Sequence, residues 1–213
     1  EVSGASVENV RLIQNEEVEF ALVQNDISFY AKNGIEMFEG DPLDNIRGVA
    51  LLYPEIIQIV TLEENDIETV RDFEGKRIAV GAPGSGTEAN ARQIIEAHGL
   101  TYDDITIDYL SFAEAVDQLR DGHVDAAFIT SGIPTSAIID LSATNNAKVI
   151  EIEDDVIAEL QEDYPFYTSL DIPGGTYSGI DEDITTVTVL AMIITNQAED
   201  EDMVYNSTAA IFE

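Results

Sequence analysis

Strand-like and helix-like segments alternate along most of the chain, and this alternation limits the fold more than any other feature. Apolar residues at alternate positions or in uncharged runs mark strands at 18–22, 77–80, 105–109 and 124–129. Helical stripes at 91–98 and 112–119 follow two of these strands, and a glycine closes each stripe. Strand, helix and strand at this spacing predict an α/β fold with a mainly parallel sheet.

Two uncharged strand-like runs, at 56–62 and 185–195, bracket the section between them. The sequence has no internal repeat, no low-complexity segment and no Ser/Gly-rich linker. We therefore expect these runs to cross between two lobes, so that strands rather than a flexible tether join the lobes.

The charge of the chain excludes several classes of partner. The sequence has 9 Lys and Arg residues against 43 Asp and Glu residues, a net charge of −34, which excludes non-specific binding to nucleic acids or anionic membranes. Because 45% of the residues are hydrophobic, the chain still has enough apolar surface to fold. The acids are spread over the whole length, which indicates a halophilic protein, since at about 1 M salt the Debye length falls to about 3 Å. Nucleic-acid mimicry is the alternative, but the acids lack a duplex-like regularity.

A glycine-rich turn at 80–88 lies between a strand and a helix, where backbone N–H groups can face an anion. A Walker A loop is excluded because the turn has no Lys. Residues 84–89 match the G-x-G-x-x-A pattern of a dinucleotide-binding loop, but the expected acid is misplaced, since Asp108 lies inside the next strand. Ser85 to Glu88 is also an S-x-x-E capping box, which Ser111 to Glu114 repeats.

Several polar turns directly follow predicted strands. They lie at 3–6, 24–26, 53–54, 84–87 and 130–132. Since ligands of open parallel sheets bind at the carboxyl ends of the strands, these turns could converge on one small polar molecule. The arginines precede strands or lie on helices, so the hydroxyl groups and helix N-termini of the turns would hold an anionic group.

The sequence offers little catalytic chemistry. His98 ends a helix, His123 lies in a turn, and Ser85 lacks the G-x-S-x-G frame of a hydrolase. There is no cysteine and no zinc-ligand spacing. Acidic clusters lack the pattern of a calcium loop and are interpreted as solvated surface, with calcium binding as the alternative; they lie at 151–155, 181–183 and 199–202. We predict no catalytic residue, no metal and no cofactor.

A series of short motifs resembles the TAXI family of TRAP-transporter solute receptors. In order, the motifs are Ser3-Gly4-Ala5-Ser6, Phe20-Ala21-Leu22-Val23-Gln24-Asn25-Asp26, Tyr53-Pro54-Glu55, Gly81-Ala82-Pro83-Gly84-Ser85-Gly86-Thr87, Asp121-Gly122-His123-Val124-Asp125-Ala126, Gly132-Ile133-Pro134 and Ile172-Pro173-Gly174-Gly175-Thr176-Tyr177. Each motif is weak alone, but together they span nearly the whole chain in the family's order.

The resemblance implies a type II periplasmic-binding-protein-like clamshell, with two α/β lobes, mainly parallel sheets and crossing strands. It implies lobe 1 at 1–57 and 186–213, and lobe 2 at 58–185 including the crossing strands. Family members are longer, so lobe 1 is expected to be incomplete, with the family's first strand and helix before Glu1 and its last helices after Glu213.

Such receptors are not enzymes. They work outside the cytoplasm at the cell surface, with a lipid anchor in the full-length protein, and deliver a small molecule to the membrane subunits of a TRAP permease. Motif matching carries over ligand contacts at Ser3, Ser6, Gln24, Asp26, Tyr53, Ser85, Gly86 and Thr87, and gives Asp125 and Pro134 structural roles.

In this account Ser85, Thr87 and backbone donors hold a carboxylate, and Asp26 favours an ammonium group. The expected ligand is an amino acid such as glutamate or glutamine, with a simple dicarboxylate second. Asp26 could equally cap a helix at 27–33. Two other functions stay open: a nucleotide-dependent α/β enzyme that uses the loop around Gly84, Ser85 and Gly86, and a ligand sensor that shares the fold but serves no transporter.

Overall fold

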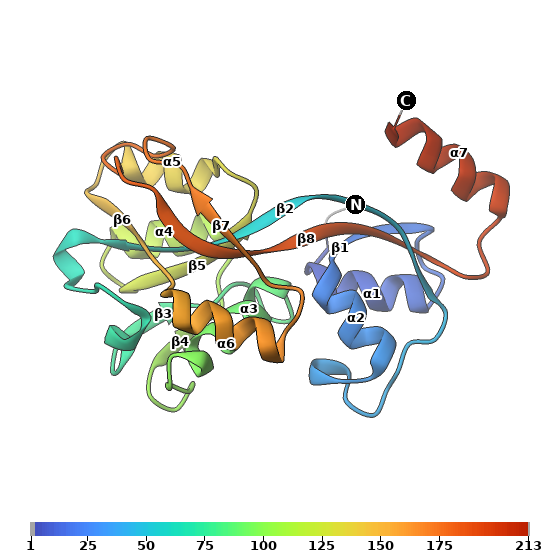
Figure 1. Cartoon of the computed structure of the whole chain (residues 1–213), viewed down its shortest axis with the longest axis horizontal. Coiled ribbons are helices and arrows are strands. Elements are labelled where there is room, and N and C mark those ends of the chain that lie inside the picture. Colours follow the sequence, from blue (N-terminus) through green and yellow to red (C-terminus); the bar gives the residue numbers. More distant parts are fainter. Residues whose placement is uncertain (1–2, 213) are drawn as a thin grey trace. The chain divides into compact units, whose positions relative to one another are not determined.

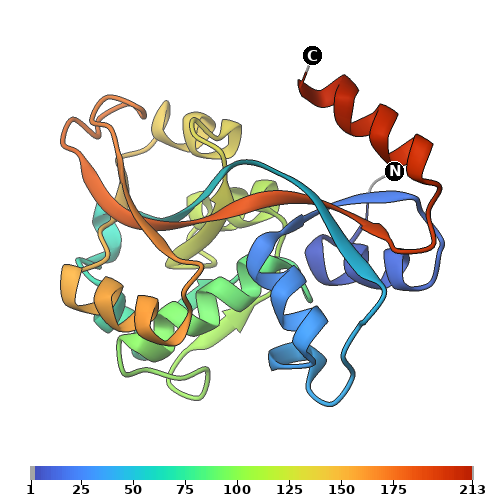
Figure 2. The ribbon, with the colours of Figure 1, turned by 45° about the vertical axis from the view of Figure 1, so that its right-hand side comes forward.

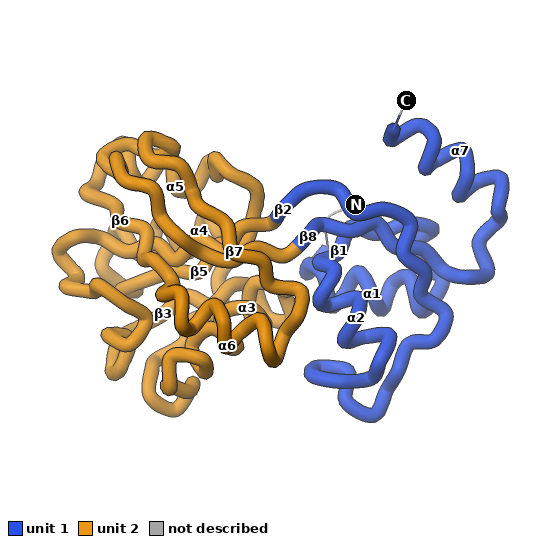
Figure 3. Tube along the Cα trace, viewed as in Figure 1, with its two compact units in different colours: residues 1–54, 190–213 blue, residues 55–189 orange. Residues whose placement is uncertain are grey.

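The structure is a computed structural model that describes residues 3–212. The chain forms two compact units, which Figure 3 colours separately: unit 1 is Glu1–Pro54 with Leu190–Glu213, and unit 2 is Glu55–Val189. Two long strands, β2 (Ile46–Leu62) and β8 (Ile184–Asn196), carry the chain from one unit to the other. They are neighbours in the sheet and run side by side in Figure 1 and Figure 2.

Unit 1 adds four helical segments and one strand to its parts of β2 and β8. These elements are α1 (Ser6–Gln14), β1 (Phe20–Gln24), α2 (Asn25–Asn33), the short 3-10 helix η1 (Glu36–Phe38) and α7 (Glu201–Phe212). β1 pairs antiparallel with β8, from Phe20 opposite Thr195 to Gln24 opposite Ala191. Val10 and Ile13 of α1 are fully buried, as is Ile27 of α2, so both helices bury an apolar face.

Unit 2 contains most of the secondary structure. Its further elements are η2 (Glu63–Asn65), η3 (Val70–Phe73), β3 (Arg77–Ala79), α3 (Gly86–Ala97), β4 (Thr106–Asp108), α4 (Phe112–Arg120), β5 (Ala126–Ser131), α5 (Ser136–Ser142), β6 (Ala147–Ile150), α6 (Asp154–Asp163) and β7 (Thr168–Ile172).

The sheet of unit 2 has helices on both faces. Alternate residues of β2 enter different hydrophobic clusters: Ile57 and Ile59 pack with residues of α3 and α6, whereas Ile56 and Val60 pack with residues of α4 and α5. This two-residue period is the expected result of a strand that is buried on both sides. The sequence prediction of an α/β fold is therefore confirmed.

The prediction of a mainly parallel sheet is wrong. The pairs β3–β4 and β3–β5 are parallel, as the strand–helix–strand units require. The pairs β1–β8, β2–β5, β2–β6 and β7–β8 are antiparallel, so the sheet is mixed. The physical reason is that β2 and β8 do not belong to the strand–helix–strand units and bring antiparallel neighbours into the sheet.

Candidate functional site

In unit 2 the glycine-rich loop folds tightly onto the N-terminus of α3. Ser85 is the N-cap residue, and its Oγ accepts a hydrogen bond from the Glu88 backbone N–H at 3.1 Å. Ser85 and Thr87 are both buried. Gly81 has φ +96°, and a Cβ at this position would lie 2.9 Å from Thr87 Cβ and 3.0 Å from Ser85 Oγ. Only glycine fits this close approach without strain, so Gly81 lets the start of the loop pack directly against Ser85 and Thr87.

A buried polar cluster, which the sequence analysis did not predict, joins α3 to β5 and to Tyr167. Tyr167 Oη accepts a hydrogen bond from Asn90 Nδ2 at 3.0 Å and donates one to Gln93 Oε1 at 2.7 Å. Thr130, near the end of β5, donates to Asn90 Oδ1 at 3.4 Å. One sequence signal could have indicated this cluster. Two amide residues, Asn90 and Gln93, lie three residues apart on the helix that also has the apolar stripe at 91–98.

A second polar cluster, also missed, lies at the carboxyl end of β5. Gln58 of β2 is fully buried, and its Nε2 donates to Ser131 Oγ at 3.2 Å and to Thr135 Oγ1 at 3.1 Å. Tyr177 Oη donates to Gln58 Oε1 and accepts from the Thr135 backbone N–H at 3.0 Å. These residues are distant in sequence, and the cluster fixes the turn at 131–135, which includes Pro134.

In unit 1 the turn between β1 and α2 brings Ser6, Gln24 and Asp26 into one buried region. Ser6 Oγ accepts a hydrogen bond from the Gln24 backbone N–H at 3.2 Å. Gln24 is only 3% exposed, and its Oε1 has no hydrogen-bond partner among residues 3–212. Asp26 is 1% exposed, and its Oδ1 accepts from the Ile27 backbone N–H at 2.8 Å in the first turn of α2. The alternative that Asp26 caps this helix is wrong, because α2 begins at Asn25 and its N-cap residue is Gln24, whose side chain makes no cap hydrogen bond. The ligand role of Asp26 stays a prediction.

Ser3 and Tyr53 lie elsewhere in unit 1. Ser3 Oγ donates to Asn9 Oδ1 at 2.5 Å. Ser3 also lines a cavity of about 550 Å³ with residues such as Leu12, Phe20 and Leu22, and the described lining includes neither Ser6 nor Gln24. Tyr53 lies on β2 with 47% of its surface exposed. Ser3 thus lies at this cavity and Tyr53 on the largely exposed half of β2, and their ligand roles stay predictions.

The contacts of Asp125 fit the structural role that the motif resemblance implies for this residue. Its Oδ1 lies 2.6 Å from Arg77 Nη2, and its Oδ2 accepts from the Arg77 backbone N–H at 2.8 Å. Burial is the largest influence on the pKa of Asp125 and raises it, but the hydrogen bonds from Arg77 outweigh burial and hold the pKa of this carboxyl below its usual value.

The acidic clusters do not assemble a metal site in the part of the chain that the structure describes. Among residues 3–212 no group of three or more His, Cys, Asp or Glu residues is arranged to hold a metal ion. Within the same residues, every helix is too short or too polar to cross a membrane.

The sequence model of the NMT1-like family matches residues 1–213, the whole chain. The chain belongs to the NMT1-like family. The fold of this NMT1-like chain is similar to that of the periplasmic aliphatic sulphonate binding protein SsuA of Escherichia coli, with a TM-score of 0.57 and 15% sequence identity. The match covers 91% of this chain and 49% of the SsuA chain. SsuA from Xanthomonas axonopodis pv. citri, bound to MOPS, gives a TM-score of 0.58 and 16% identity over 99% of this chain and 58% of that one.

A truncated arginine-binding protein from T. maritima, in its arginine-bound form, is also similar to the NMT1-like chain. Its TM-score is 0.52, with 12% identity over 96% of this chain and 72% of that one. The NMT1-like chain thus spans about half the length of the SsuA chains. At these identities the likeness concerns the fold, and the predicted fold class, that of the periplasmic binding proteins, is confirmed.

Proposed function

We propose that this NMT1-like chain is part of an extracytoplasmic solute receptor that captures a small carboxylate or amino acid. The observation that carries the proposal is its fold similarity to periplasmic binding proteins, two of them bound to MOPS or arginine. We further propose the TAXI type, in which the receptor delivers its ligand to the membrane subunits of a TRAP permease, because the motif series of the chain has that family's order.

The loop of unit 2 supplies the chemistry for an oxyanion. The first N–H groups of α3 have no partner within the helix, and Gly86 has no side chain to keep a ligand from the backbone. The dipole of this helix adds partial positive charge at the same end. With the hydroxyl groups of Ser85 and Thr87, these donors favour a carboxylate or a sulfonate, and we propose that Ser85, Gly86 and Thr87 contact the ligand.

The β1–α2 turn of unit 1 supplies the opposite chemistry. Gln24 Oε1 is a buried acceptor that lacks a hydrogen-bond partner within residues 3–212, and the Asp26 carboxyl is buried beside it in sequence. Both groups attract N–H donors, so an ammonium or amide group of the ligand is favoured. This combination of an oxyanion and an N–H donor supports glutamate or glutamine as the ligand class. In this proposal Ser6 orients Gln24, and Ser3 and Tyr53 are weaker candidate contacts.

We also propose that units 1 and 2 correspond to the two lobes of such a receptor. The two strands that join the units support this correspondence, since they replace a flexible linker. The net charge of −34 supports a protein that works at high salt, where surface repulsion is screened.

The test is a calorimetric titration of this chain in molar KCl with glutamate, glutamine, arginine, a dicarboxylate, an alkanesulfonate and a nicotinamide nucleotide. Ser85→Ala and Ser111→Ala are matched variants, because both remove an N-cap serine that accepts from the backbone of a Glu three residues later. Both should lose about 1 kcal/mol of stability. Only Ser85→Ala should also weaken ligand binding, by about tenfold, which is about 1.4 kcal/mol.

Three results would count against the proposal. Equal affinity in Ser85→Ala and wild type would remove Ser85 from the ligand site. Saturable binding of the nucleotide alone would favour the dinucleotide-binding alternative instead. Binding of none of these compounds would overturn the proposed ligand class.

A further inference from the structure

The two S-x-x-E sequences of unit 2 form different hydrogen bonds, although both begin a helix. At the start of α4 the capping box is reciprocal. The Glu114 backbone N–H donates to Ser111 Oγ at 3.4 Å, while Glu114 Oε2 accepts from the Ser111 hydroxyl at 2.6 Å and from the Ser111 backbone N–H at 3.0 Å. These bonds hold the pKa of Glu114 below its usual value. The hydroxyl proton of Ser111 is therefore used within the box.

At the start of α3 only the serine half of the box forms. Ser85 Oγ accepts from the Glu88 backbone N–H at 3.1 Å, and the Ser85 backbone N–H donates to the Ala82 carbonyl oxygen at 3.0 Å. The Glu88 carboxylate does not turn back to Ser85, and its Oε1 accepts instead from Tyr102 Oη at 3.0 Å. The hydroxyl proton of Ser85 therefore has no acceptor among residues 3–212.

The unused proton of Ser85 lies at a buried position. Ser85 is 5% exposed and the neighbouring Thr87 is 4% exposed, and no hydrogen bond joins the Thr87 hydroxyl to another residue in the described part of the chain. Buried donors nearly always find an acceptor in folded proteins. Two buried hydroxyl groups with unused protons, beside the free N–H groups of a helix N-terminus, thus point to an acceptor such as an oxyanion of a ligand.

Tyr102 is placed to keep the carboxylate of Glu88 away from Ser85. It lies in the loop between α3 and β4, and its half-buried ring packs against the hydrophobic cluster that includes Ile94 and Ile105. Burial raises the pKa of Tyr102, and the charge and hydrogen bond of Glu88 raise it further. The phenol therefore keeps its proton and donates it to the carboxylate.

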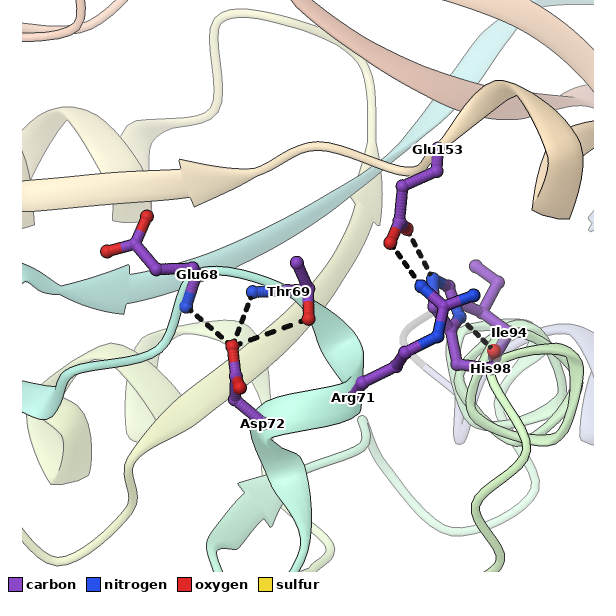
Figure 4. A network of polar contacts seen from close by, with 7 residues as sticks. All are labelled: Glu68, Thr69, Arg71, Asp72, Ile94, His98 and Glu153. Carbon is purple, nitrogen blue, oxygen red and sulfur yellow. Dashed lines mark hydrogen bonds and ion pairs between the residues drawn. The ribbon is translucent and has the colours of Figure 1, made fainter.

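The rest of α3 is fixed by contacts that do not involve Tyr102. Two amide side chains in the middle of the helix are bonded to Tyr167, as described above. At the C-terminal end, His98 Nε2 lies 2.9 Å from Glu153 Oε2, and Figure 4 shows the same carboxylate meeting the Arg71 guanidinium. The helix is thus held in place without Tyr102, and a change of Tyr102 should act on the first turn alone.

We propose that Tyr102 is a positioning residue for the glycine-rich loop of unit 2. By holding the Glu88 carboxylate, it leaves the hydroxyl proton of Ser85 to an oxyanion of the ligand. This inference rests on the function proposed above, in which Ser85 contacts the ligand. Without the Tyr102 hydroxyl, Glu88 should take the Ser85 proton as Glu114 takes that of its own serine, and the ligand would then compete with an internal carboxylate.

Thermal unfolding tests, without any ligand, whether Glu88 turns to Ser85 when Tyr102 is changed. Tyr102→Phe keeps the ring and removes only the hydroxyl group. The midpoints of Ser85→Ala, Glu88→Ala and their double variant, each with and without Tyr102→Phe, give the coupling between the two positions. The shifts should add in the wild-type background and depart from additivity by about 2 °C in the Tyr102→Phe background.

Ser111→Ala and Glu114→Ala form the matched control pair, because their box is complete in the wild type. Their shifts should depart from additivity whether or not Tyr102 is changed. Additive shifts of Ser85→Ala and Glu88→Ala in the Tyr102→Phe background would overturn the proposal, since Glu88 would then have found another partner.

Calorimetric titration with glutamate as the probe tests the consequence for binding. Tyr102→Phe should weaken binding about fivefold. In the Glu88→Ala background the same substitution should change the affinity by less than about twofold, because no carboxylate remains to take the Ser85 proton. Tyr109→Phe, at a tyrosine that is 46% exposed, is the control and should leave the affinity unchanged.

The two experiments separate failure of this inference from failure of the proposed function. If the wild type binds glutamate but Tyr102→Phe binds it equally well, Tyr102 is not a positioning residue and the proposed function stands. The same holds if Tyr102→Phe weakens binding equally with and without Glu88, because Tyr102 then does not act through the carboxylate. If the wild type binds no oxyanion, the proposed function fails and the effect on binding with it, and the thermal midpoints still decide whether Tyr102 keeps Glu88 from Ser85.

Discussion

The two units of the chain differ in how completely they satisfy their own buried groups. In unit 2, fully buried amides such as Gln58 and Asn90 are hydrogen-bonded to side chains from distant segments. Within residues 3–212, every buried side-chain polar atom that lacks a partner belongs to unit 1; these atoms are Gln14 Oε1, Gln24 Oε1, Ser28 Oγ and Asn45 Oδ1. Unit 1 also has the cavity of about 550 Å³ and helix α7, of which no described residue is buried.

The difference concerns the hydrogen-bond pairing of buried side-chain polar atoms, which is more complete in unit 2 than in unit 1 among the described residues. Buried polar atoms in folded proteins nearly always find a partner, because an unpaired one costs about 1–3 kcal/mol. Unit 2 therefore pairs its buried polar groups within itself, whereas unit 1 would gain stability from further hydrogen bonds to its unpaired atoms. The buried acceptor of Gln24, next to the proposed ligand group Asp26, is the most specific example.

The largest expected effect is in the core of unit 2. Phe128 is fully buried, and its ring packs edge to face against the ring of Phe73, with the two ring centroids 6.1 Å apart. Phe128→Ala should cost about 3–5 kcal/mol of unfolding free energy through lost burial and a cavity. Phe212→Ala on α7, where the side chain is 67% exposed, should change it by less than about 0.5 kcal/mol. Denaturant unfolding measures both, and similar losses would mean that α7 is as well packed as the core of unit 2.

A pair of buried glutamines gives the next effect. Gln58→Leu should cost about 2 kcal/mol, because Tyr177 Oη loses its acceptor and Ser131 and Thr135 lose a donor. Gln24→Leu removes an oxygen that lacks a partner in the described residues, so its cost should stay below about 1 kcal/mol. The same unfolding experiment compares them. If Gln24→Leu is the more destabilising, the two units do not differ in the way described.

The smallest effect should have the opposite sign. Ser28 in α2 is buried, and its Oγ is unpartnered among residues 3–212, so Ser28→Ala should stabilise the chain by about 0.5 kcal/mol through helix propensity and removal of the unpaired group. Ser142→Ala is the matched control in unit 2, because Ser142 Oγ donates to the Ile139 carbonyl oxygen at 3.2 Å. It should be neutral or slightly destabilising. Thermal midpoints resolve the two signs, and a loss of stability in Ser28→Ala would reveal a partner for its hydroxyl group.

Local signals in the sequence predicted the local parts of the structure. Both predicted N-cap serines accept a hydrogen bond from the backbone N–H three residues later, because this bond needs only local geometry. The reciprocal capping box is complete at Ser111, whereas at Ser85 only the serine half forms, and the Glu88 carboxylate accepts instead from Tyr102 Oη at 3.0 Å. The loop before α3 was also located, because its glycines have a positive φ or a close approach that other residues do not tolerate. The ligand contacts carried over from the motifs remain predictions.

Features that depend on distant residues were not predictable in this way. The strand at 56–62 proved to be the buried half of β2, which begins at Ile46. The other half has an apolar run at 49–53, but Arg47, Gly48 and Pro54 flank this run and interrupt the strand pattern. The direction of the strands next to β2 and β8 depends on topology and not on hydrophobic period, so the mixed sheet was missed. The contacts of Glu153 with His98 and Arg71 join three elements, and no sequence spacing brings these residues together.

The two strands that join the units also affect the order in which the protein can form. Unit 2 is one continuous stretch of chain, whereas unit 1 combines residues from both sides of it. During synthesis, β1 is made long before its partner β8, and the whole of unit 2 lies between them. Unit 2 can therefore fold while the chain is still growing, and unit 1 can be completed only when residues 191–195 emerge and the long loop between its halves is already compact.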